Sequence, residues 1–122
     1  MKVFSFEKLK VWQKSRQLSI VIYNRTKSYP DDERFGLVSQ MRRSAISISS
    51  NIAEGSGRYN SKDKARFTEI AFGWALELLN QTIISSDLQF ISKEDYLHVR
   101  NELTEIMAML DSLRKSQLKH DN

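Results

Sequence analysis

The sequence predicts an all-α protein that folds as a single antiparallel up-down-up-down four-helix bundle. One proline and four glycines among 122 residues leave few places for turns, whereas a strand-rich fold needs a turn about every 10 residues. Apolar residues recur at spacings of three and four over long stretches, which is the period of an amphipathic helix. The turn signals between these stretches are short, and short loops place consecutive helices antiparallel and side by side.

The first helix is expected over residues 5–28, because Tyr29-Pro30 follows and a residue before proline disfavours the α region. The second is expected over residues 32–54, with Asp31 or Asp32 as its N-cap and Gly55 as the C′ glycine that ends it. The predicted buried seams are Val11, Ser15, Leu18, Ile22 and Thr26 in the first helix, and Val38, Met41, Ala45, Ile48 and Ile52 in the second.

The third helix, predicted over residues 61–87 with Asn60 or Ser61 as its cap, has two apolar stripes on different sides. One comprises Phe67, Ile70, Ala71, Trp74 and Leu78, and the other comprises Phe72, Leu76, Leu79 and Ile83. A helix in a simple bundle needs one stripe, so we expect the second to contact another subunit. The fourth helix is predicted over residues 92–115, with Ser92 as its cap and one clean apolar stripe.

Composition excludes several kinds of protein. A chain without cysteine forms no disulfide and no thiolate metal site. No apolar run approaches the about 20 residues of a membrane span, and the N-terminus lacks an apolar signal-peptide core. We therefore expect a cytoplasmic protein.

Positive charge is concentrated at the N-terminal end. Residues 1–28 hold seven basic side chains and one acidic one, or +6, and the other twelve basic and fourteen acidic residues give −2, which together make the net charge of +4. Two interpretations stay open. The asymmetry suits an anionic partner, most commonly RNA or DNA, and it also suits a solvated helix face that only aids solubility.

Two groups of cations are the candidates for phosphate contact. Lys10, Lys14 and Arg25 share the polar face of the first helix, and Arg58, Lys62, Lys64 and Arg66 surround the turn into the third helix, where Tyr59 is placed to stack on a base. No base-reading motif is visible, so we expect binding that is weakly specific and sensitive to salt.

The second helix carries two adjacent arginines with different environments. Arg43 falls on the polar face and is the freer cation, whereas Arg42 falls inside the apolar arc, where a guanidinium must be paired. We predict that Arg42 approaches Glu77, within a chain or across a subunit interface.

The end of this helix has a carboxylate that the helix dipole disfavours. Glu54 should therefore be compensated by Arg58 or Arg66, and Asn51, one turn earlier, is a candidate to bind the backbone of the turn.

Catalysis has little support in the sequence. The two histidines, His98 and His120, are far apart and lack the spacing of a helical metal site, so no metal or cofactor is predicted. Arg114 and His120 match the loose arginine, five residues, histidine pattern of HEPN-type ribonucleases, in which they would serve phosphate stabilisation and acid-base catalysis. A chance match is a better explanation of this pattern than a ribonuclease site. A protein-protein scaffold without nucleic-acid binding is the other alternative.

The chain resembles the four-helix bundle family of 23S rRNA intervening-sequence proteins over nearly its whole length. The matching features are Leu9-x-x-Trp12, Ile22-Tyr23, Tyr29-Pro30, Gln40-x-Arg42-Arg43-Ser44-Ala45, Ser50-Asn51-Ile52-Ala53-Glu54-Gly55, Arg58, Arg66-Phe67, Ile70-Ala71 and Glu77-Leu78. Trp74, where a serine commonly follows the glycine, departs from the pattern.

The resemblance implies a bacterial, non-enzymatic bundle that assembles into a ring-like homopentamer. The chain is more loosely similar to accessory variability proteins of diversity-generating retroelements, which use a basic surface to bind nucleic acid and a reverse transcriptase. RNA, DNA and a reverse transcriptase or another nucleic-acid enzyme are therefore the implied partners.

Overall fold

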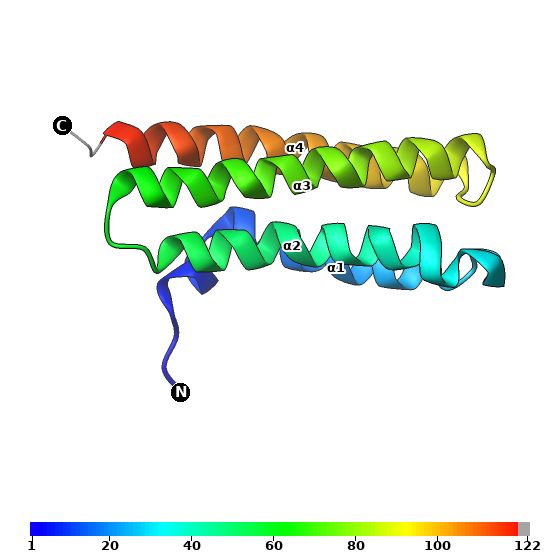
Figure 1. Ribbon diagram of the computed structural model, residues 1–122, viewed down its shortest axis with the longest axis horizontal. Coiled ribbons are helices and arrows are strands. Elements are labelled where there is room, and N and C mark those ends of the chain that lie inside the picture. The colour runs from blue at the N-terminus through cyan, green and yellow to red at the C-terminus, as the bar shows by residue number, and fades with distance from the viewer. Residues whose placement is uncertain (120–122) are drawn as a thin grey trace.

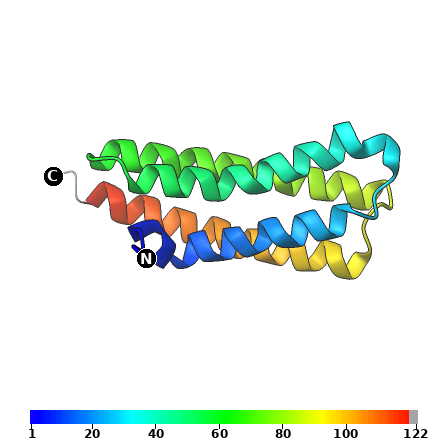
Figure 2. The same cartoon turned by 90° about the horizontal axis from the view of Figure 1, so that it is seen from below.

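A computed structural model of the protein describes residues 1–119, and in that range the chain forms four long antiparallel α-helices. They are α1 (Lys10–Thr26), α2 (Ser39–Ser56), α3 (Ser61–Asp87) and α4 (Lys93–Lys119). Helices α3 and α4 lie above α1 and α2 in Figure 1, and Figure 2 shows α2 beside α3 and α1 beside α4. Each helix therefore packs against its two neighbours in a four-helix bundle, and the predicted all-α fold is confirmed.

The start of α1 lies five residues later than predicted. Residues Ser5–Lys8 form a short 3-10 turn, and Leu9 is extended, with φ −75° and ψ 124°. The Glu7 carboxylate accepts a hydrogen bond from the Phe4 backbone N–H at 2.8 Å. The Phe6 ring packs edge-on against Trp12 with centroids 5.0 Å apart. These contacts fold the N-terminal segment back on the bundle, so the first helix is Lys10–Thr26.

The connection from α1 to α2 also differs from the prediction. Asp31–Glu33 is a 3-10 turn and Arg34–Val38 is a π-helical segment with a kink at Gly36, so α2 begins at Ser39 and neither Asp31 nor Asp32 is its N-cap. Glu33 caps the π-helical segment instead, because its carboxylate accepts a hydrogen bond from the Leu37 N–H at 3.3 Å, and α2 itself has Val38 at its N-cap. The wider π turn leaves Phe35 88% exposed, on the solvent side of the bundle.

Gly55 does not end α2, as had been predicted, but lies within its last turn. The helix ends at Ser56 with Gly57 at its C-cap. Gly55 is buried because α3 crosses it closely: a Cβ at this position would lie 2.7 Å from Cβ of Phe67. Asn51 does not bind the turn either, because its side-chain amide donates to the Ser47 carbonyl at 2.7 Å. Gly55 is therefore a contact glycine between two helices.

The caps of the last two helices agree with the sequence. The Asn60 side chain accepts a hydrogen bond from the Asp63 N–H at 2.8 Å, and the Ser92 hydroxyl accepts one from the Asp95 N–H at 3.1 Å. Helix α4 continues to Lys119, four residues beyond the predicted end. Between the two helices, Gln89 adopts a left-handed conformation with φ 61°.

The core consists of inward-facing residues from all four helices. Both seams predicted for the first two helices are buried throughout. The inward face of α3 differs from its predicted stripe, because small and polar residues hold most of it: Ala65, Thr68, Ala71, Ala75, Thr82 and Ser85. Small side chains let α2 and α3 approach closely. Leu78 and Phe67 are the large apolar residues that remain on this inward face.

The two apolar stripes of α3 have partners within the chain. Trp74 lies on the side toward α2, where Arg43 covers its ring. Phe72 lies on the side toward α4, in a hollow with Leu110, and Phe72 and Leu79 both pack against the core. Leu76 stays 49% exposed. The second stripe therefore does not by itself require another subunit.

Candidate nucleic-acid interface

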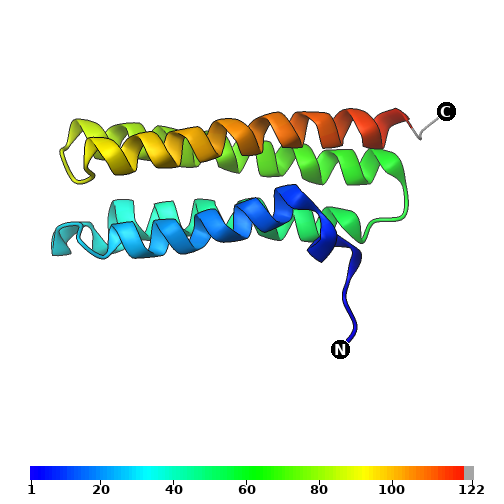
Figure 3. The same ribbon diagram turned by 180° about the vertical axis from the view of Figure 1, so that it is seen from behind.

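Helix α4 pairs with two of the four basic residues of α1. Helix α1 contains no acidic residue, and Figure 3 shows it on the near side next to α4. Lys14 Nζ lies 3.0 Å from Glu102 and 3.1 Å from Glu105, and Arg25 lies 3.2 Å from Asp95. Hydrogen bonds to Glu102 and Glu105 raise the pKa of Lys14. Helix α4 thus engages two of the seven basic residues in the stretch 1–28, and the others form no ion pair within residues 1–119.

Lys10 is the remaining member of the predicted group on α1. It is exposed and forms no ion pair with any residue of the described chain. One exposed lysine is a weak phosphate site, so the sequence-predicted α1 patch does not assemble as a cluster of free cations.

The turn from α2 to α3 carries cations that are already engaged. Arg58 pairs with Glu54 at 2.9 Å, as the sequence had suggested, and Arg66 lies 3.7 Å from Asp63. Both guanidinium groups also lie over the Phe67 ring, 4.5 and 4.7 Å from its centroid. These arginines are held by carboxylates and by an aromatic ring.

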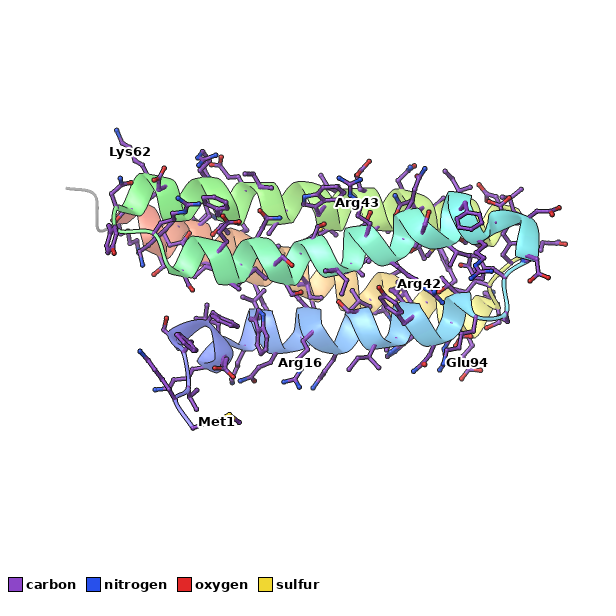
Figure 4. The ribbon with its side chains drawn as sticks, turned by 60° about the horizontal axis from the view of Figure 1, so that its bottom comes forward. Met1, Arg16, Arg42, Arg43, Lys62 and Glu94 are labelled. Atoms are coloured by element: carbon purple, nitrogen blue, oxygen red, sulfur yellow. The ribbon has the colours of Figure 1, made fainter. Side chains whose placement is uncertain are left out.

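The other candidates at this turn are less constrained. Lys64 Nζ donates to the Ser56 carbonyl at 3.4 Å. Lys62 is exposed and projects from the end of the bundle (Figure 4), and Tyr59 is fully exposed. Carboxylates of Glu54 and Asp63 line the hollow beside Tyr59, so the turn is a surface of mixed charge.

Arg42 is held by α1 and makes no contact with Glu77 within the chain. Its Nε donates to the Thr26 hydroxyl at 3.0 Å, and its terminal NH2 donates to the Tyr23 carbonyl at 3.2 Å. The guanidinium lies 4.7 Å from the centroid of the Tyr23 ring. The prediction of a carboxylate partner was wrong within the chain because neutral acceptors and an aromatic ring take that place. Within residues 1–119, therefore, no carboxylate pairs with Arg42.

Two further arginines lie beside it with the same kind of contact. Arg43 lies over Trp74 of α3 at 5.6 Å, and Arg34 lies over the neighbouring Phe35 at 5.5 Å. Neither forms an ion pair within residues 1–119. In Figure 4, Arg42 lies between α2 and α1, and Arg43 lies toward α3. Adjacent positions on one helix thus direct two guanidinium groups to its two sides.

These arginines line an open groove of about 480 Å³ at the α1–α2 surface. Its lining contains no carboxylate, and α2 has its only acidic residue, Glu54, near the opposite end. The residues that line the groove are Tyr23, Arg34, Phe35, Val38, Ser39, Arg42, Arg43, Ile46 and Ser47. Here the surface combines uncompensated cations with exposed aromatic and aliphatic groups.

Sequence reasoning found only part of this groove. It identified Arg43 as a free cation, but it assigned Arg42 to packing and overlooked Arg34 and Phe35. The available signal was the stretch from Arg34 to Ala53, which contains three arginines and no acidic residue. The π turn that exposes Phe35 has no comparable signal in the sequence.

The ribonuclease alternative gains no support from the geometry. Arg114 Nε lies 2.6 Å from Glu69, so its guanidinium is paired with a carboxylate. His98 is exposed on α4, and His120 lies outside the described residues. No group of three or more His, Cys, Asp or Glu side chains suited to a metal ion occurs within residues 1–119. In the same range, no helix combines the length and the apolar character needed to cross a membrane.

Comparison with known proteins identifies the family. A solved structure with the same fold is that of a protein of unknown function from the S23 ribosomal protein family of Bacteroides thetaiotaomicron. It has a TM-score of 0.80 and 28% sequence identity, and the match covers 86% of this chain and 95% of the other. No curated protein matches the chain. The family model for 23S rRNA-intervening sequence proteins matches residues 7–112, and the chain therefore belongs to that family.

Proposed function

We propose that this protein is a non-enzymatic helical bundle that binds RNA or DNA through the arginines of the α1–α2 groove. The observation that carries the proposal is that Arg34, Arg42 and Arg43 line one groove and form no ion pair within the described chain. A phosphate that pairs with such a cation does not have to displace a carboxylate of the protein. Binding is then driven by the counterions that the nucleic acid releases.

The aromatic contacts of these arginines support the same proposal. A guanidinium stacked on a ring keeps its charge, and at Arg34 and Arg43 its in-plane donors match two oxygens of a phosphate. Arg42 already donates from Nε and one terminal nitrogen to Thr26 and Tyr23, so it contributes mainly its charge. Stacking on Tyr23 and Trp74 also restricts Arg42 and Arg43 before any ligand arrives. Less side-chain freedom is then lost on binding.

The family name connects its members with intervening sequences of 23S rRNA, which makes RNA the first polyanion to test. Homo-oligomerisation is part of the proposal, as the family resemblance implies a homopentamer. Several copies would place several small grooves on one particle, and linked sites bind a long strand more tightly than one site does. A reverse transcriptase or another nucleic-acid enzyme is the protein partner that the resemblance favours.

A salt titration of binding tests the proposal. Fluorescence anisotropy would follow labelled RNA and DNA over a range of salt concentrations, with the wild type and an Arg34→Ala/Arg43→Ala variant. Loss of two phosphate contacts should lower the slope of log K against log salt by about 1.4 to 1.8. Both side chains are exposed, so the fold should be unaffected.

The matched control is Lys93→Ala/Arg100→Ala on α4. It removes the same charge, and Arg100 lies over the Tyr96 ring as Arg34 lies over Phe35 and Arg43 over Trp74. We expect the control to keep the wild-type slope. Equal slopes for both double variants would place the phosphate contacts outside the groove. If the wild type bound no nucleic acid at low salt, the alternative of a protein-protein scaffold would be favoured.

A further inference from the structure

We propose that the α1–α2 groove takes a single strand of nucleic acid in preference to a duplex, with an unpaired base stacked on Phe35. This inference rests on the proposed function and names the form of nucleic acid that the groove selects. The juxtaposition that carries it is an aromatic ring and an apolar floor beside three cations that lack ion pairs in the described chain.

Phe35 has the exposure that a stacking platform needs. Its side chain is 88% exposed, and the π-helical segment Arg34–Val38 holds it at the rim of the groove. Arg34 lies 5.5 Å from the ring centroid. A base that stacks on this ring removes apolar surface from water, and the adjacent Arg34 is in position to pair with the phosphate of the same strand.

The floor of the groove favours bases over a bare phosphate backbone. Tyr23 and Ile46 are 41% and 43% exposed, and Val38 lies below them. A duplex keeps its bases paired inside and presents phosphates and sugars, so it would leave this apolar floor uncovered. A single strand can turn its bases inward and cover it.

The size of the groove fits a short segment of a strand. Its volume of about 480 Å³ lies in the range of about 300 to 1,000 Å³ that small-ligand pockets occupy. That is room for one stacked base and part of its neighbour, but not for the width of a double helix. The duplex could only contact the cations at the rim.

Tyr59, the aromatic residue predicted to stack on a base, is a poorer platform. Tyr59 is fully exposed, but Glu54 and Asp63 line the hollow beside it. Both carboxylates are paired with the arginines of this turn, so a phosphate beside Tyr59 would have to compete with them for Arg58 and Arg66. The α1–α2 groove has no acidic lining residue, so the inference assigns the stacking role to Phe35.

The test compares a single-stranded oligonucleotide, its duplex and an abasic strand of the same length, in RNA and DNA arms. We expect the single strand to bind about tenfold tighter than the duplex at equal salt, the gain of roughly one stacked base. Phe35→Ala should remove about that factor for the single strand. It should leave the abasic strand, the duplex and the salt slope unchanged, because no charge is lost.

Two further variants separate stacking from folding and charge. Phe35→Trp keeps a stacking surface and should retain binding, while Phe4→Ala, an exposed ring near the N-terminus, should match the wild type. Arg34→Ala should lower the salt slope by about 0.7 for a single strand.

Some outcomes would overturn this inference alone. Base stacking on Phe35 would be refuted if the duplex bound as tightly as the single strand, or if Phe35→Ala bound as tightly as Phe4→Ala. Salt-sensitive binding through the arginines would be unaffected by either result. If no nucleic acid bound even at low salt, the proposed function would fail together with the inference.

Discussion

Replacing Gly55 by alanine tests how tightly α2 and α3 pack at the end of the bundle. The added Cβ would lie 2.7 Å from Cβ of Phe67 and 3.4 Å from the Lys64 carbonyl oxygen. A Cβ atom and a backbone oxygen are fixed by the main chain, so neither can move away by rotation of a side chain. The helices must separate, and the buried contacts around Phe67 must loosen.

Two opposing effects set the magnitude. Alanine is favoured over glycine within a helix by about 1 kcal/mol, while overpacking a close contact costs about 1 to 3 kcal/mol. A clash between two fixed atoms belongs at the upper end of that range, which leaves a net loss of about 2 kcal/mol. For a chain of this size the melting temperature should fall by about 8 °C. Circular dichroism during thermal and urea unfolding measures both quantities.

Gly73→Ala is the matched control. Gly73 also lies within a helix, but a Cβ there would meet nothing within 4 Å. Only the helix propensity changes, so this variant should be more stable by about 0.5 to 1 kcal/mol. The two glycines should therefore shift stability in opposite directions. A stabilised Gly55→Ala variant would refute the close helix contact.

Three further predictions concern charge, burial and assembly. Lys14→Met should lose under about 1 kcal/mol at neutral pH. Glu102 and Glu105 raise the pKa of Lys14 in the folded state above its ordinary 10.5, so the ion pairs stabilise the wild type below that pH. The difference should shrink as pH rises from 10.5 through the higher pKa of the folded state, as urea titrations at several pH values would show. The Tyr29 hydroxyl is buried with no hydrogen bond that meets geometric criteria in the described chain, so Tyr29→Phe should be neutral or slightly stabilising. Burial also raises the pKa of Tyr29, and the variant should lack the part of the alkaline loss of stability that sets in as pH rises past about 10. In light scattering, the wild type should be a homo-oligomer, and Leu76→Glu, at an exposed apolar position of α3, should reduce its mass; a monomeric wild type would contradict the assembly proposal.

The bundle was predictable because helical periodicity is a local property. The predicted seams of α1 and α2 are buried from Val11 to Thr26 and from Val38 to Ile52, since a spacing of three and four leaves one face for the core. Boundaries were harder. The late start of α2 depends on the π turn at Arg34–Val38, and the burial of Gly55 depends on where α3 crosses. The spacing of apolar residues within one helix predicts neither the π turn nor the place where another helix crosses.

Which cations are free was harder to predict from the sequence than which residues are buried, because it also depends on how the helices pack. The excess of +6 in residues 1–28 is a property of the sequence, but its availability depends on which helix lies opposite. Helix α4 places Glu102, Glu105 and Asp95 against α1 and engages Lys14 and Arg25. A sum over sequence therefore overestimated the cations of α1 that a phosphate can reach.

The angular positions of residues around α2 that place Met41 in the core also place Arg42 and Arg43 on the surface at its two sides. Position 41 is fully buried, so positions 42 and 43 flank the core at about 100° and 200° around the helix. One side chain reaches α1 and the other reaches α3, and each meets an aromatic ring instead of a carboxylate. An ion pair at either site would have cancelled one of the three positive charges that line the groove. Because the rings hold the guanidinium groups without cancelling their charge, the surface of α2 keeps the cations that our proposal assigns to nucleic acid.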